Sequence, residues 1–226
     1  MLVYGKNVFD ELRDNLKQVR RVYLSNKSVD KELITKLEQN KIRYELIDVK
    51  RLDKIVDGKH QGIIAEIHDY EYLTIQDLMT ENTLVILDHL EDPHNFGAII
   101  RTCEAAGIKG IIIPKDRSVS VNATVMKTSS GALSHVKIAM VNNLTNAINK
   151  LKDNNYFIYG TAANGKNYQQ VDYASKKVIV IGSEGKGMSR IVQNACDEII
   201  SIPMHGKINS LNASVAAAII IYGIIK

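Results

Sequence analysis

The most constraining feature of this chain is a pattern that occurs three times, in which a short apolar run leads into a polar, glycine- or asparagine-containing segment. The three segments are LDHLEDPHNFGAIIRT at 87–102, VIVIGSEGKGMSR at 178–190 and ISIPMHGKINSLNASVAAAI at 200–219. Short Ile, Val and Leu runs of this kind are typical of parallel strands that are buried on both faces. Polar residues just beyond such strands line the crevice where open α/β sheets bind ligands. The pattern therefore predicts an α/β fold whose ligand site is built from three loops.

The alternation of strand and helix continues through the C-terminal two thirds of the chain. The predicted strands are 84–87, 110–113, 136–139, 156–159, 178–181 and 198–202. The predicted helices are 96–106, 122–129, 143–153, 189–195 and 212–225. Strands and helices that alternate in this way favour a mostly parallel sheet with helices on both faces.

The N-terminal part predicts a small α/β unit of its own. Its helices are expected at 7–16, 30–40 and 49–56, and its strands at 21–24, 44–47 and 62–67. The residues that follow, 68–83, are rich in Asp, Glu, Thr and Gln and predict a polar connection. We therefore expect one domain at 1–69, a linker at 70–83 and a second domain at 84–226.

Composition narrows the classes of protein that fit. The net charge of +4 permits a nucleic-acid partner without demanding one. The two cysteines, Cys103 and Cys196, do not have the spacing of a metal site, and so few thiols predict a reducing, cytoplasmic location. The most apolar stretch, 214–225, is too short to cross a bilayer and predicts a buried helix, so no membrane partner is expected.

The first polar segment offers Asn95 and Arg101 at the start of an apolar helical pattern. On composition alone Asn95 could simply cap that helix, and Arg101 could be a solvated helical side chain. The acids and histidines of the same segment could suggest a metal site. However, they lack the helical His spacing and a second group of ligands, so a surface loop is the better interpretation and no metal is expected.

The second and third segments have the composition of a small-molecule pocket. Glycines at 182–187 let a flat ligand approach the backbone, although their spacing is neither a dinucleotide fingerprint nor a phosphate-binding loop. Ile202, Met204 and Leu211 could enclose an adenine ring, whereas Ser210 and Asn212 could equally cap the last helix.

The segment GTAANGKN at 160–167 nearly matches a phosphate-binding loop, but Asn167 stands where a magnesium-ligating Ser or Thr belongs. Nucleotide hydrolysis is therefore not expected.

Together, and in this order, the three segments resemble the motifs of the SpoU/TrmH family of RNA ribose 2′-O-methyltransferases, within the SPOUT superfamily. The resemblance is specific from about residue 84 to the C-terminus. It implies S-adenosylmethionine as methyl donor, a C-terminal trefoil knot and a homodimer formed through the catalytic domain. It also implies active-site roles for Asn95, Arg101, Glu184, Ser210 and Asn212. The donor pocket that it implies consists of Thr161, Ala162, Gly182, Ile202, Pro203, Met204 and Leu211.

By the same resemblance Arg101 is the proposed proton acceptor. A guanidinium resists deprotonation at neutral pH, so anchoring a phosphate or stabilising the forming alkoxide are alternative roles for this residue.

The N-terminal unit resembles the ribosomal-protein-like RNA-binding domain of bacterial ribosomal-RNA members of the family, through YGKNV at 4–8 and HQGI at 60–63. Its candidate RNA contacts are Lys17, Arg20, Arg21, His60 and Gln61. Transfer-RNA members commonly lack this extension, so the resemblance favours a guanosine in 23S ribosomal RNA as substrate. A transfer-RNA 2′-O-methyltransferase and a non-catalytic RNA-binding module are the alternatives.

Overall fold

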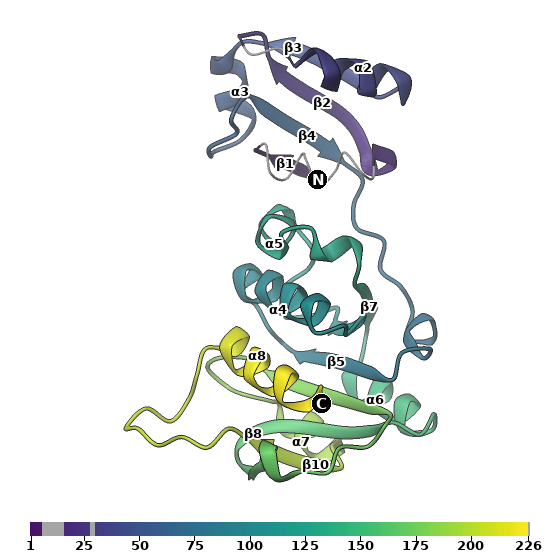
Figure 1. Ribbon diagram of the computed structural model, residues 1–226, viewed down its shortest axis with the longest axis vertical. Helices are drawn as coiled ribbons and strands as arrows, with labels where there is room; N and C mark the ends of the chain where they lie inside the picture. Colours follow the sequence, from purple (N-terminus) through teal and green to yellow (C-terminus); the bar gives the residue numbers. More distant parts are fainter. Residues whose placement is uncertain (6–15, 28–29, 226) are drawn as a thin grey trace. The chain divides into compact units, whose positions relative to one another are not determined.

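The computed structural model describes residues 1–5, 16–27 and 30–225 (Figure 1). It divides into two compact units, the first made of residues 1–70 with 121–131 and the second of residues 71–120 with 132–226. The helix predicted at 7–16 lies almost wholly outside the described residues. The segment 121–131 includes a short helix, α5 (Ala123–Ser129), whose N-cap is Asn122.

The first unit contains a four-stranded mixed sheet. Its strand order is β1 (Leu2–Tyr4), β4 (Ile63–Ile67), β2 (Val19–Ser25) and β3 (Arg43–Ile47). β2 and β3 run parallel, whereas β4 runs antiparallel to both β1 and β2. The helices α2 (Lys31–Gln39) and α3 (Val49–Ile55) each begin at an aspartate whose carboxylate accepts a backbone N–H of the first turn. The expected small α/β unit is present, and β1 is a strand that the sequence pattern did not predict.

The second unit is built on a six-stranded sheet in which every pair of neighbours is parallel. The strand order is β10 (Glu198–Ser201), β8 (Phe157–Asn167), β9 (Lys177–Gly182), β5 (Thr83–Asp88), β6 (Gly110–Pro114) and β7 (Lys137–Val141). All the strands predicted for this half of the chain are confirmed with ends that shift by one or two residues, except that β8 extends to Asn167, well beyond its predicted end at 159. The mostly parallel α/β fold expected from the sequence is therefore confirmed.

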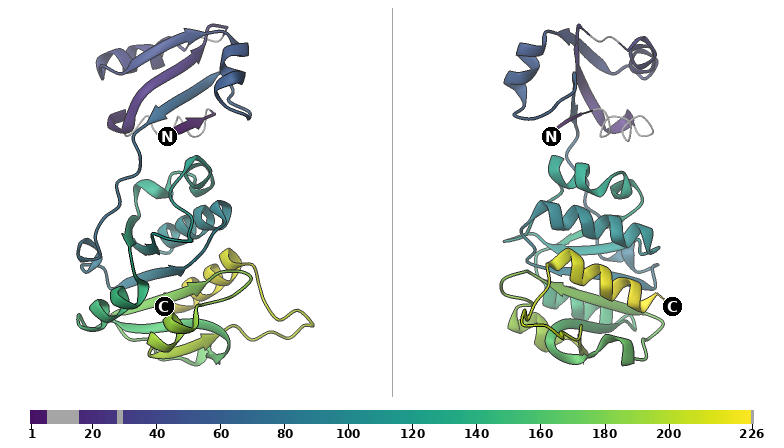
Figure 2. Two further views of the ribbon diagram at one scale, coloured as in Figure 1. Left: turned by 180° about the vertical axis from the view of Figure 1, so that it is seen from behind. Right: turned by 60° about the vertical axis from the view of Figure 1, so that its left-hand side comes forward.

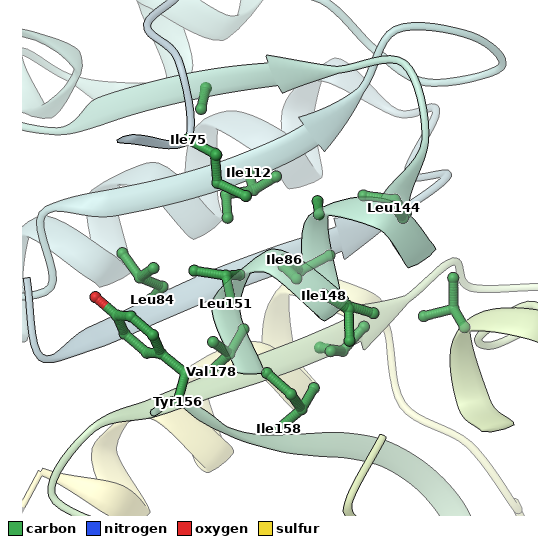
Figure 3. Packing of buried hydrophobic residues seen from close by; sticks show 14 of the residues in the cluster. Ile75, Leu84, Ile86, Ile112, Leu144, Ile148, Leu151, Tyr156, Ile158 and Val178 are labelled. Carbon is green, nitrogen blue, oxygen red and sulfur yellow. The ribbon is translucent and has the colours of Figure 1, made fainter. Parts of the chain in front are cut away.

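Helices cover both faces of this sheet (Figure 2). On one face α4 (Pro93–Ala105) packs against α8 (Ala213–Ile224), and on the other α6 (Leu144–Lys152) packs against α7 (Arg190–Ala195). The core between the sheet and α6 includes Leu84, Ile86, Ile148 and Val178, each fully buried (Figure 3). Because the strands are buried on both faces, their chemically distinctive residues lie at their ends.

The segment at 70–83, predicted as a polar connection, packs against the second unit. The Leu73 N–H donates to the Ile138 carbonyl (2.9 Å) and so extends the sheet beside β7. Ile75 and Leu78 belong to the core cluster and are 5% and 0% exposed. The Tyr156 hydroxyl donates to the Glu81 carbonyl at 2.5 Å. We therefore propose that the second domain begins near residue 71.

This packing gives a testable stability difference between two fragments. A fragment of residues 71–226 should unfold cooperatively, whereas one of residues 84–226 should be markedly less stable. Burying an aliphatic side chain such as Ile75 or Leu78 contributes about 1.5–3 kcal/mol each, out of a typical total of about 5–15 kcal/mol. Thermal unfolding followed by circular dichroism would measure the difference, with Leu73→Ala in the longer fragment as a mild control, since Leu73 is 36% exposed. Equal unfolding temperatures for the two fragments would show that residues 71–83 are only a connection.

Candidate active site

The carboxyl ends of the parallel strands meet at one edge of the sheet, and a cavity of about 360 Å³ lies there. It is lined by part of β8, by the ends of β9 and β10 with the loops that follow them, and by one face of α8. The lining includes Thr161, Ala162, Gly182, Glu184, Ile202, Met204, Ser210 and Leu211. Eight of the residues predicted from the sequence are therefore brought together around one cavity.

An irregularity between β8 and β10 brings part of β8 to the cavity. The two strands pair at Gly160↔Ile199 and then at Lys166↔Ile200, so residues 161–165 leave the ladder. The Ser201 hydroxyl donates to the Gly165 carbonyl at 2.7 Å and holds the far end of this bulge. A Cβ on Gly165 would lie 2.6 Å from the Ile199 carbonyl oxygen, so the bulge needs glycine there. The sequence that nearly matches a phosphate-binding loop is thus a bulged strand.

The loop after β9 is a tight turn held at both ends. Ser183 and Gly187 exchange backbone hydrogen bonds of 3.1 and 2.9 Å. The Ser189 N–H, at the start of α7, donates to the buried carboxylate of Asp88 at 2.6 Å. Asp88 ends β5 and pairs in register with Gly182, so the neighbouring strand fixes where the turn begins and where it ends.

Asn95 connects the first polar segment to this turn. Its side-chain amide donates to the Glu184 carboxylate, although Asn95 itself is only 8% exposed. The alternative in which Asn95 caps the helix is wrong, because Asp92 is the N-cap of α4 and accepts the N–H groups of His94 and Asn95 at 3.0 and 3.2 Å. The Asn95 side chain is therefore available to orient a carboxylate at the cavity.

The acidic side chains of the first segment have different hydrogen-bond partners and do not converge on one point. Asp88 accepts from Ser189 and lies 2.5 Å from His89 Nδ1, while Asp92 caps α4. In the part of the chain that the structure describes, no group of three or more His, Cys, Asp or Glu side chains is arranged to hold a metal ion.

The third segment contributes both to the cavity and to a helix. Asn212 is the N-cap of α8, since its Oδ1 accepts from the N–H groups of Ser214 (2.9 Å) and Val215 (3.4 Å). The capping alternative is thus confirmed for Asn212, while Ser210 lines the cavity. Pro203 lies between two lining residues, Ile202 and Met204, without lining the cavity itself.

Arg101 stands apart from this group. It lies on α4 with an exposed side chain and does not line the cavity. It has no hydrogen bond or ion pair with any residue that the structure describes. The opposite side of the helix buries Ile99, Ile100 and Cys103. Arg101 is therefore free to meet a ligand from outside the cavity.

Sequence reasoning did not include the part of the lining that comes from α8. Ala213, Ala216 and Ile220 all line the cavity. Their spacing of three and four residues places them on one face of the helix, and this periodicity is the signal that could have identified them.

The candidate RNA contacts of the first unit differ in how exposed they are. Lys17 is exposed, whereas Arg20 pairs with Glu66 and Arg21 with Glu45, each at 3.3 Å. His60 is 7% exposed, and its Nδ1 accepts the Gly62 N–H, so Nε2 carries the proton that faces Asp53. With both nitrogens engaged, His60 holds the turn that presents Gln61. RNA contact by these residues stays a prediction.

Neither cysteine has the properties of a nucleophile. Burial raises the pKa of Cys103 to about 12, and burial is also the largest cause that raises the pKa of Cys196 to about 12. Thiols with such high pKa values are protonated at neutral pH, so thiolate chemistry is not part of this site.

The helices that the structure describes include none that is both long and apolar enough to cross a membrane.

Comparison with known families identifies the chain. The model of the SpoU rRNA methylase family matches residues 82–222, which contain the whole cavity. The chain belongs to the SpoU rRNA methylase family. A second model, for RNA 2′-O ribose methyltransferase substrate binding, matches residues 2–73. The SpoU-family membership makes this protein an RNA methyltransferase, and the resemblance drawn from the three segments is confirmed.

Individual relatives agree with this assignment. A Staphylococcus saprophyticus protein, provisionally named a TrmH family tRNA/rRNA methyltransferase, is 45% identical over 203 residues, covering 86% of this chain and 82% of its own. The fold matches the SpoU methyltransferase AviRb from Streptomyces viridochromogenes, solved with AdoMet, with a TM-score of 0.85 at 21% identity; the match covers 100% of this chain and 89% of AviRb. The Aquifex (A. aeolicus) TrmH/SpoU tRNA modifying enzyme matches at 30% identity with a TM-score of 0.58, over 66% of this chain and 79% of its own.

Proposed function

We propose that this SpoU-family enzyme transfers a methyl group from S-adenosylmethionine to a ribose 2′-hydroxyl of 23S ribosomal RNA, on a guanosine. The observation that carries the proposal is the cavity at the carboxyl edge of the sheet, where three loops and the Asn95–Glu184 contact meet. The catalytic domain, near residues 71–226, performs the transfer. The N-terminal domain binds the RNA.

The residues around the cavity fit the methyl donor. A volume of about 360 Å³ lies within the range of about 300–1,000 Å³ that is typical of small-molecule pockets. Ile202, Met204 and Leu211 offer apolar surface to an adenine ring, while Gly182 and Gly185 offer bare backbone. The carboxylate of Glu184 favours a cationic ligand. When bound, S-adenosylmethionine supplies an electrophilic methyl group on its sulfonium sulfur.

The remaining site residues act on the RNA side. Asn95 fixes the rotamer of Glu184 through its amide, so this carboxylate keeps one position at the cavity. Arg101 can accept the 2′-hydroxyl proton, as the family resemblance implies. Alternatively, its planar N–H donors can stabilise the 2′-alkoxide while solvent accepts that proton, or hold the adjacent phosphate. Ser210 and Asn212 place a hydroxyl and an amide beside the cavity mouth, and Asn212 keeps its Nδ2 group available while Oδ1 caps α8.

Three observations support ribosomal RNA over transfer RNA. The family model is described as an rRNA methylase family, and the substrate-binding model matches the first unit. The Aquifex tRNA modifying enzyme matches only 66% of this chain.

The assembly that we propose is a cytoplasmic homodimer of knotted catalytic domains. The exposed apolar side chains of α8, Val215 at 47% and Tyr222 at 54%, support it, because an apolar face of this kind is typical of an interface.

Methyl transfer with labelled S-adenosylmethionine tests the proposal. Purified 23S ribosomal RNA and total transfer RNA, both from a strain that lacks the gene, would serve as acceptors with and without EDTA. We expect label in the ribosomal RNA, in a nucleotide that resists alkaline hydrolysis at its 3′ side, and no effect of the chelator. Label in transfer RNA alone would support the alternative function, a transfer-RNA 2′-O-methyltransferase. Label on a base would contradict ribose methylation, and loss of turnover in EDTA would indicate a required metal.

A further inference from the structure

Four basic side chains at the carboxyl edge of the parallel sheet are not used by the site described above. Lys115 and Arg117 follow β6, Lys186 lies in the loop after β9, and Lys207 lies in the loop after β10. All four are exposed. Because every strand of this sheet is parallel, these loops share the edge that holds the cavity. We call these four residues the carboxyl-edge cations.

The side chains of the carboxyl-edge cations have no hydrogen-bond or ion-pair partner among the residues that the structure describes. At the opposite, amino edge of the sheet, Lys137 pairs with Glu81 at 3.1 Å and Lys152 pairs with Asp197 at 2.6 Å, whereas the exposed side chain of Lys109 has no partner among the described residues. Lys177 donates to the Ala174 carbonyl at 3.1 Å. The paired lysines at the amino edge therefore offer a control for the unpaired cations at the carboxyl edge.

Most acids near the carboxyl-edge cations are already engaged. Asp88 is buried against Ser189, Asp92 caps α4, and Glu184 accepts from Asn95. Glu91 and Asp116 are the exposed acids of the loops after β5 and β6. None of these acids forms an ion pair with the four cations among the described residues, which leaves the cations available to bind an anionic ligand.

Two of the loops that carry these cations, those after β6 and β9, are joined through the loop after β5. The Val119 N–H and the Ser118 hydroxyl both donate to the Leu90 carbonyl, at 2.7 and 3.2 Å, and so fasten the loop after β6 to the loop after β5. The loop after β5 is fastened in turn to the loop after β9 through Asp88 and Ser189. Lys186 lies between Gly185 and Gly187, which both line the cavity, and Lys207 lies between the lining residues Met204 and Asn209. The carboxyl-edge cations thus lie on a rim of loops that runs up to the cavity, and two of these loops are connected.

We propose that Lys115, Arg117, Lys186 and Lys207 bind backbone phosphates of the RNA strand that carries the target ribose. This inference rests on the proposed function and deepens it, since it gives the catalytic domain an RNA surface of its own. Phosphate contacts position a strand without reading its sequence, which suits a rim that must present one ribose to the donor. Each contact releases counterions, so binding should weaken with salt in proportion to the number of contacts.

The salt dependence of RNA binding tests the proposal in the full chain. The probe is a fluorescein-labelled single-stranded oligouridylate, titrated by anisotropy over a series of KCl concentrations. The variants are K115A/R117A and K186A/K207A. Each double variant should reduce the slope of log K against log salt by about 1.4, because one contact to single-stranded nucleic acid contributes about 0.7. K186R/K207R keeps both charges and should keep the wild-type slope.

A matched control separates local contact from net charge. K137A/K152A removes the same two charges from the amino edge, where both lysines already have acidic partners, and should leave the slope unchanged. An equal change in this control, or wild-type slopes in both carboxyl-edge variants, would overturn the proposal. Calorimetry with S-adenosylmethionine checks the fold, since donor affinity should not change. If K186A/K207A loses donor binding, the salt slopes of the single variants K186Q and K207Q test the proposal in its place.

Turnover distinguishes this inference from the proposed function. With ribosomal RNA as acceptor, the carboxyl-edge variants should raise the KM for RNA while kcat holds. Absence of methyl transfer by the wild-type protein would reject the proposed function, and the slope measurement would still report on the rim. Normal methyl transfer with an unchanged KM and slope in both double variants would reject only phosphate binding by the carboxyl-edge cations.

Discussion

Replacing Gly182 with Ala is expected to weaken binding of S-adenosylmethionine by about two orders of magnitude. A Cβ at this position would lie 2.2 Å from the Gly187 carbonyl carbon and 2.3 Å from the Met188 nitrogen. Both are backbone atoms that cannot rotate away, so the turn after β9 must shift. That turn lines the cavity from Ile181 to Gly187, and its far end is fixed by the Asp88–Ser189 bond. The displaced wall should narrow or open the pocket.

Overpacking of this kind typically costs about 1–3 kcal/mol, and each 1.4 kcal/mol of lost binding energy is a factor of about ten in Kd. We expect the donor Kd to rise by about two orders of magnitude in calorimetry. Gly206→Ala is the matched control, because its Cβ would meet nothing within 4 Å and Gly206 does not line the cavity. A Gly182→Ala variant that binds the donor within threefold of wild type would show that the donor binds elsewhere.

Replacing Arg101 with Ala is expected to leave donor affinity nearly unchanged and to reduce turnover by about two to three orders of magnitude. Loss of one preorganised electrostatic group in a catalytic site commonly has an effect of about that size. The Arg101 side chain is exposed and has no partner among the described residues, so its removal should not destabilise α4. Arg101 also lies outside the cavity lining, which explains why donor binding should survive. Single-turnover rates and calorimetry on the same preparation would measure the two effects.

The Arg101→Lys variant separates the possible roles of this side chain. A lysine cannot reproduce a planar, bidentate set of donors, so activity should stay low if geometry matters. Activity close to wild type would favour a simple positive charge and phosphate anchoring. If Arg101→Ala also turns over normally, the role assigned to this residue on the family resemblance is wrong.

The strand ends were predictable because local sequence determines them. Runs such as LVIL at 84–87 and VIVI at 178–181 can be buried on both faces, and the glycines and asparagines that follow cannot continue a strand. Parallel strands then bring their carboxyl ends together, which is why Gly182, Glu184 and Met204 could be grouped from their positions along the chain. The face of α8 that lines the cavity was within reach of the same periodicity.

The choice of helix cap in the first segment was ambiguous for a local reason. Asp92 and Asn95 can both cap a helix, and the segment DPHN contains both. Pro93 at the first helical position favours Asp92, because proline is well placed at that site. This signal could have identified Asp92 as the cap, which leaves the Asn95 side chain available for another partner. That partner is Glu184, which lies 89 positions further along the chain.

The sequence by itself determined the alternation of strand and helix, the three loops and the residue types around the cavity, because these follow from local periodicity and turn chemistry. Tertiary structure alone decided which of those residues have partners. Ile75 and Leu78 look like apolar residues in a polar connection until the core of the second unit covers them, and His60 looks like a surface ligand until Asp53 and Gly62 engage both nitrogens. Tertiary structure also decides which lysines have an acidic partner. Lys152 pairs with Asp197, whereas Lys186 has no acidic partner among the described residues. Burial and ion pairing depend on residues distant in sequence, so a local pattern cannot specify them.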